Sequence, residues 1–62
     1  MSNEEINEQL IKWLKKNRLK KIVLEDITGK TRSMIWKKFN NVHPWTDTEI
    51  KLLINHGAIK LV

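Results

Sequence analysis

The chain has 62 residues, with 12 Lys and Arg against 7 Asp and Glu, so its formal net charge is +5. A chain this short forms one small domain at most, with a single modest core. The absence of cysteine excludes a disulfide, a thiolate zinc site and a thiol nucleophile. His43 and His56 are too far apart to match a metal-ligand spacing. We therefore predict no metal, no cofactor and no enzymatic activity.

The apolar content favours a folded protein and excludes a membrane span. Hydrophobic residues make up 40% of the chain, which is too many for a chain that stays disordered. Charged residues interrupt every apolar run well before the about 20 residues that a spanning helix needs. The N-terminus is acidic and has no secretory pattern, so we expect a cytoplasmic protein without a membrane partner.

Positive charge is concentrated in the middle of the chain. The segment 12–38 holds ten basic and two acidic residues, a net of +8, whereas segment 1–11 has a net of −3. A basic segment folded onto one face is typical of a protein that binds a polyanion. The alternative is a solvated basic surface that only keeps the protein soluble.

The first predicted element is a helix over 3–17. Ser2 and Glu5 have the spacing of a capping box, which satisfies free backbone N–H groups at a helix start. Apolar residues follow at helical spacing. They are Ile6, Leu10, Trp13 and Leu14.

Two short helices follow, separated by a sharp turn. The apolar spacing of Leu19, Val23, Leu24 and Ile27 predicts a helix over 20–27. Gly29 is suited to the positive φ of a tight helix exit. Thr31 is a good N-cap for a helix over 32–39, which carries Ile35 and Phe39 on one face.

The last predicted helix covers 46–56, after a loop at 40–44. Thr46 and Glu49 form a second capping box, and Gly57 is the expected terminator. The tail 58–62 fits a short strand, a segment packed on the core, or a dimer contact, for which it is our first candidate. The fold class is therefore all-α, a single domain over 1–62 with four or five short helices.

Residues 20–39 fit a helix-turn-helix, in which a turn containing Gly joins two helices and the second enters the DNA major groove. The segment from Leu24 to Ile35, LEDITGKTRSMI, resembles the motif of the Cro and phage repressor (XRE-like) family, usually L-A-x-x-x-G-V-S-x-x-x-I. Asn40-Asn41 and segment 44–50 are also similar to that family. The resemblance implies a lambda-repressor-like fold and a small phage or prophage regulator in a bacterial host cell.

Three residues depart from what this motif and its packing need. Glu25 replaces a small Ala, so we expect its side chain to bend toward solvent or to pair with Lys30 or Arg32. Lys30 replaces an apolar residue of the turn. Lys38 lies on the inner flank of the second helix, and we expect its stem to snorkel toward solvent.

With Ile35 inward, one face of the helix over 32–39 points outward. Side chains on this face can reach base edges in the major groove, as Arg does with guanine. The predicted base contacts are Arg32, Ser33, Trp36 and Lys37. Backbone phosphates need cations, amides or a helix N-terminus nearby. The predicted phosphate contacts are Lys20, Lys21, Lys30, Thr31, Asn40 and Asn41.

The three tryptophans divide between surface and core. Trp36 fits either a contact with DNA or packing toward the last helix beside Trp45. Trp13 and Trp45 are predicted to be core residues, because each lies on an apolar stripe or at a helix entry.

These patterns predict a sequence-specific DNA-binding transcriptional regulator, and the resemblance implies a Cro-like repressor of phage or prophage operators. We expect its partner to be a double-stranded DNA operator, bound by a homodimer because one domain reads few base pairs. The alternative is an antirepressor or corepressor that binds a phage repressor protein through the same fold.

Overall fold

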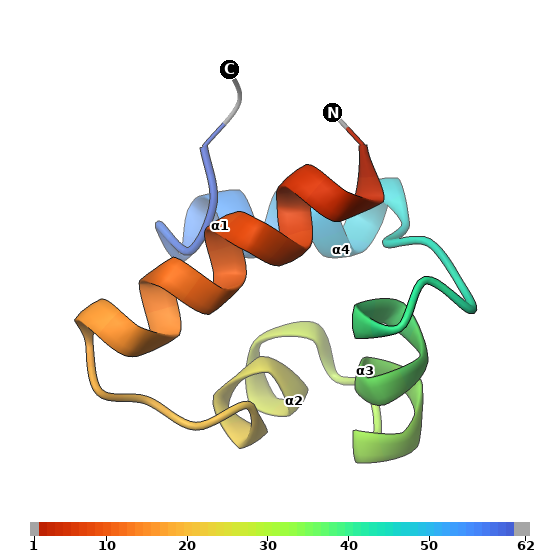
Figure 1. The fold of residues 1–62 in the computed structure, drawn as a ribbon, viewed down its shortest axis with the longest axis horizontal. Helices are drawn as coiled ribbons and strands as arrows, with labels where there is room; N and C mark the ends of the chain where they lie inside the picture. Colours follow the sequence, from red (N-terminus) through yellow and green to blue (C-terminus); the bar gives the residue numbers. More distant parts are fainter. Residues whose placement is uncertain (1, 61–62) are drawn as a thin grey trace.

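The computed structural model describes residues 2–60, and within them it contains four α-helices and no strand (Figure 1). The helices are α1 (Asn3–Lys16), α2 (Ile22–Thr28), α3 (Arg32–Phe39) and α4 (Asp47–Asn55). In Figure 1, α4 lies behind α1, and α2 and α3 occupy the opposite side of the molecule. The predicted all-α class is confirmed.

One core joins all four helices and the segment after α4. Each helix contributes apolar side chains at helical spacing, so the amphipathic stripes meet in the centre. The buried apolar residues are Ile6, Leu10, Leu14, Leu24, Ile35, Trp45, Leu53, Ala58 and Ile59. Trp45 is buried as predicted, and Trp13 packs against the core while half-buried.

Side chains cap three of the helix starts. Ser2, Thr31 and Thr46 each accept a hydrogen bond from the backbone N–H three residues ahead. The Thr46–Glu49 capping box is complete, because the Glu49 carboxylate also accepts from the Thr46 backbone N–H at 2.8 Å. The hydroxyl half of the box predicted at Ser2 is confirmed.

Helices α1, α3 and α4 end with the same backbone arrangement. After α1, α3 and α4 a residue with positive φ turns the chain, and the next N–H returns to a carbonyl five residues back, as in a Schellman motif. These residues are Arg18 (φ 53°), Asn41 (φ 59°) and Gly57 (φ 78°). Gly is the usual residue here because a Cβ is strained at positive φ. Arg18 therefore adopts a conformation that costs free energy.

Helix α2 begins later in the chain than predicted, because the exit from α1 extends further. The Leu19 N–H bonds to the Leu14 carbonyl at 2.8 Å, so Arg18 and Leu19 complete the exit from α1. Helix α2 then begins at Ile22 instead of residue 20. Lys20 and Lys21 consequently precede the helix.

The turn between α2 and α3 has the three residues Gly29, Lys30 and Thr31. Gly29 has φ 71° and donates to the Glu25 carbonyl, which closes α2. The buried residues Leu24 and Ile35 face the core from either side of the turn, as predicted. Helices α2 and α3 therefore form a helix-turn-helix-like unit (Figure 1).

The segment after α4 packs on its own chain. Ala58 and Ile59 are 3% and 2% exposed. The Lys60 backbone exchanges two hydrogen bonds with the Gln9 amide of α1, at 2.7 and 3.1 Å. The tail therefore packs on the core at Ala58 and Ile59, which is one of its three predicted alternatives, and the dimer contact stays a prediction. The remaining residues of the tail, 61 and 62, lie outside the described residues.

Candidate nucleic-acid interface

The outward face of α3 carries the four residues predicted to read bases. Arg32, Ser33 and Trp36 are exposed, and Lys37 is half-buried. Trp36 is 60% exposed, so its indole does not fold over α4 beside Trp45. Ile35 anchors the opposite face in the core. The helix thus presents donors and one large aromatic ring to solvent.

Arg32 makes one ion pair along this surface. Its Nε lies 3.9 Å from Oε2 of Glu25, which confirms one of the pairings expected for that carboxylate. The Arg32 side chain is 85% exposed, so solvent screening leaves the pair with little effect on stability. The guanidinium can therefore exchange this contact for a ligand at little cost.

Four of the predicted phosphate contacts lie just before α2 or in the turn after it. Lys20 and Lys21 precede α2, and Lys30 and Thr31 lie in the turn, all exposed. The Lys21 ammonium lies 4.6 Å from the centre of the Phe39 ring, a cation–π contact that links the start of α2 to the end of α3. The Thr31 hydroxyl accepts from the Met34 N–H at 3.4 Å and caps α3.

Asn40 and Asn41 have structural bonds that sequence reasoning missed. Asn40 Nδ2 donates to the Trp36 carbonyl at 2.8 Å. Asn41 Oδ1 accepts from Asn3 Nδ2 at 2.7 Å and from Asn7 Nδ2 at 3.4 Å. The available signal was the pair Asn3 and Asn7, whose spacing of four puts both amides on one face of α1.

A hollow of about 530 Å³ separates the start of α2 from the exposed face of α3. The residues around this hollow include some of the predicted base contacts and some of the predicted phosphate contacts. Its lining residues are Lys20, Lys21, Ile22, Glu25, Arg32, Ile35 and Trp36. Ile22 was absent from the predicted site, because its outward position depends on where α2 begins.

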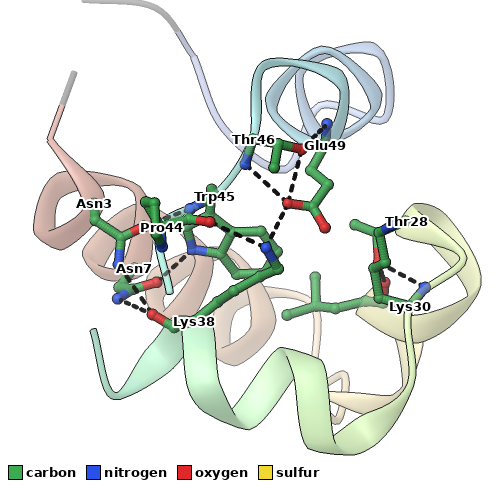
Figure 2. A network of polar contacts seen from close by, with 10 residues as sticks. Asn3, Asn7, Thr28, Lys30, Lys38, Pro44, Trp45, Thr46 and Glu49 are labelled. Atoms are coloured by element: carbon green, nitrogen blue, oxygen red, sulfur yellow. Dashed lines mark hydrogen bonds and ion pairs between the residues drawn. The ribbon is translucent and has the colours of Figure 1, made fainter. Parts of the chain in front are cut away.

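Lys38 is buried, which corrects the expectation that its stem snorkels to solvent. Its ammonium lies 2.7 Å from Glu49 Oε1 and donates to the Pro44 carbonyl at 3.0 Å (Figure 2). It also lies 5.5 Å from the centre of the Trp45 ring. These partners hold the ammonium inside, because a buried charge is tolerated where it is paired and hydrogen-bonded. The pair joins α3 to α4.

Asn7 of α1 completes this network from the other side. Its Oδ1 accepts from Trp45 Nε1 at 2.7 Å, and its Nδ2 donates to the Lys38 carbonyl at 3.1 Å. Figure 2 shows Asn7, Lys38, Trp45 and Glu49 meeting between α1, α3 and α4. The inner side of α3 is thereby fixed to two other helices.

The pKa of the Glu49 carboxyl lies below its ordinary value of 4.5. Burial is the largest influence and raises the pKa, because desolvation disfavours the charged form. Hydrogen bonds from Lys38 and from the Thr46 N–H and hydroxyl, together with the Lys38 charge, outweigh burial and lower it. Glu49 is therefore a carboxylate at neutral pH, although its Oε2 has no hydrogen-bond partner among the described residues.

Across residues 2–60, no group of three or more His, Cys, Asp or Glu side chains could hold a metal ion. No helix in that same range is long and apolar enough to cross a membrane.

In comparisons with known proteins, no family model, no curated protein and no solved structure matches the chain.

Proposed function

We propose that this protein is a sequence-specific DNA-binding transcriptional regulator, a Cro-like repressor that acts by occupying an operator. One observation carries the proposal: the exposed Arg32, Ser33 and Trp36 stand on a helix that follows a three-residue turn and whose inner side is locked into the core. A rigid helix with outward donors is what readout of base edges in the major groove requires.

The charge distribution supports a polyanionic partner. Lys20, Lys21 and Lys30 are exposed beside α3, within a segment of net charge +8. Cations placed around a reading helix neutralise phosphates and set its orientation on the duplex. In this proposal the cations supply affinity, and Arg32 supplies sequence preference through guanine N7 and O6.

Two copies acting on a two-fold operator complete the proposal. A single α3 spans too few base pairs to select one site in a genome, whereas two copies read half-sites about 10 base pairs apart. Blocking polymerase needs neither a cofactor nor a reaction. The proposed setting is the cytoplasm of a bacterial host.

Selection of bound sites from a pool of random duplexes tests this function. The expected result is an enriched sequence with two-fold symmetry, whose affinity falls with salt at a log–log slope of about −3 to −6. Recovery of unrelated sequences, or a flat slope, would overturn the proposal.

A protein partner is the second candidate, favoured by the exposure of Trp36 and Arg32 on one helix face. Trp and Arg are enriched among the residues that dominate protein interfaces. An antirepressor would bind a phage repressor through this face and would leave the random duplex pool unenriched.

A further inference from the structure

The hollow between α2 and α3 combines an apolar lining with a cationic border. Ile22, Ile35 and Trp36 supply the apolar surface, while Lys20, Lys21 and Arg32 supply three positive charges against the one negative charge of Glu25. Ile22 is 53% exposed and Trp36 is 60% exposed, although both are large apolar side chains. Single exposed apolar residues are ordinary, but two that line one hollow on a basic surface suggest a ligand with matching chemistry.

The charge around the hollow restricts what can fill it. An occupant must be anionic where it meets Lys20 and Lys21, must accept hydrogen bonds from Arg32, and must be apolar where it meets Ile22 and Trp36. In the DNA major groove, phosphates provide the first property, and the C5-methyl group of thymine is the apolar group on the base edges. Thymine is the only one of the four DNA bases that carries an alkyl group on its major-groove edge.

We propose that this hollow receives the C5-methyl group of a thymine, so that Ile22 and Trp36 make the protein prefer thymine next to the base read by Arg32. The inference rests on the proposed DNA-binding function and adds a specific chemical feature of the operator. In this proposal Trp36 contributes to base selectivity through an apolar contact and not through a hydrogen bond.

Deoxyuridine provides the probe, because it pairs as thymine does and lacks only the methyl group. Each thymine of a selected duplex is replaced singly, and binding is titrated at fixed salt. At one thymine in each half-site we expect affinity to fall about fourfold. This is the change in the dissociation constant that corresponds to the free energy of burying one methyl group. The other replacements should leave affinity unchanged.

Protein variants connect this preference to the hollow. Trp36→Ala should bind the thymine and deoxyuridine duplexes equally at that position, and Ile22→Ala should reduce the preference. Leu52→Ala is the matched control, because Leu52 is an exposed apolar residue of α4 outside the hollow. It should retain the full preference. The unfolding midpoint of Trp36→Ala should match that of the parent, because the removed side chain is largely exposed.

The two proposals fail in different ways. Salt-dependent, sequence-selective binding in which no thymine is sensitive to its methyl group overturns this inference and leaves DNA binding intact. Retention of the preference by Trp36→Ala also overturns it. Absence of salt-dependent binding to any duplex overturns the DNA-binding function, and the inference with it.

Discussion

The ammonium of Lys38 lies 2.7 Å from the carboxylate of Glu49, and both side chains are almost completely shielded from solvent. One residue belongs to α3, which carries the candidate reading face, and the other to the first turn of α4. The same oxygen, Glu49 Oε1, also accepts hydrogen bonds from the Thr46 N–H and hydroxyl and so completes the capping box. One carboxylate oxygen therefore both holds α3 and caps α4. The position of α3 therefore depends on a polar contact inside the core.

Breaking this pair should destabilise the fold strongly. Lys38→Met leaves the Glu49 carboxylate buried without its cation, and loss of one partner of a buried pair costs about 3–5 kcal/mol. The measurement is the free energy of unfolding in urea. The double variant Lys38→Met/Glu49→Leu removes both charges and should recover most of that loss, since apolar replacements of a buried pair are often neutral. Glu49→Leu is the second single variant of this cycle. If the stability lost in the double variant equals the sum of the losses in Lys38→Met and Glu49→Leu, the two residues are not coupled.

Acid should weaken the fold through Glu49. Its folded pKa lies below its ordinary value of 4.5, so its contribution to stability is complete above that pH and is lost as pH falls through the folded pKa. Urea unfolding of the parent and of Glu49→Gln, from neutral to strongly acidic pH, checks this dependence. The stability advantage of the parent should shrink as pH falls, and an advantage that stays constant would contradict the lowered pKa.

Asn7 should be more important than an ordinary polar residue of α1. Asn7→Leu leaves Trp45 Nε1 and the Lys38 carbonyl without this partner, and an unsatisfied buried polar group costs about 1–3 kcal/mol. Asn55→Ala, at an exposed position of α4, serves as the control and should change the unfolding free energy little. Equal effects of the two substitutions would mean that the Asn7 bonds do not stabilise the fold.

The two helix exits at Arg18 and Gly57 should respond in opposite directions. Both residues have positive φ, and a side chain in that region costs about 1–2 kcal/mol. Arg18→Gly should therefore raise the thermal unfolding midpoint, and Gly57→Ala should lower it. Beyond its two chain neighbours, a Cβ at Gly57 would meet no heavy atom within 4 Å, so the loss reports backbone strain and not a steric clash. A lower midpoint in Arg18→Gly would show that the Arg18 side chain stabilises the fold by more than its backbone strain costs.

Local signals in the sequence predicted most of the fold. Apolar spacing identified the four helices, and Thr31, Thr46 and Gly29 marked their ends because capping and positive φ depend on adjacent residues. The start of α2 was misplaced because the exit from α1 uses Arg18, a residue type that carries no signal for positive φ.

The contacts that fix α3 depend on residues distant in sequence and were not predictable in this way. Lys38 was expected at the surface because its partner, Glu49, belongs to another helix. The bonds of Asn7 and Asn41 likewise join segments more than 30 positions apart. Of the residues predicted to point outward from α3, Arg32, Ser33 and Trp36 are exposed, because helical spacing determines which side chains oppose Ile35, whereas Lys37 is half-buried.

The most direct test of α3 as a reading helix compares Arg32→Ala with Lys21→Ala on a selected duplex and its single-base variants. Arg32→Ala should lose about 1–3 kcal/mol of discrimination at one base position, whereas Lys21→Ala should weaken binding to every duplex alike and reduce the salt slope by about one. If both variants weaken all duplexes uniformly, α3 does not read bases and the proposed function is wrong.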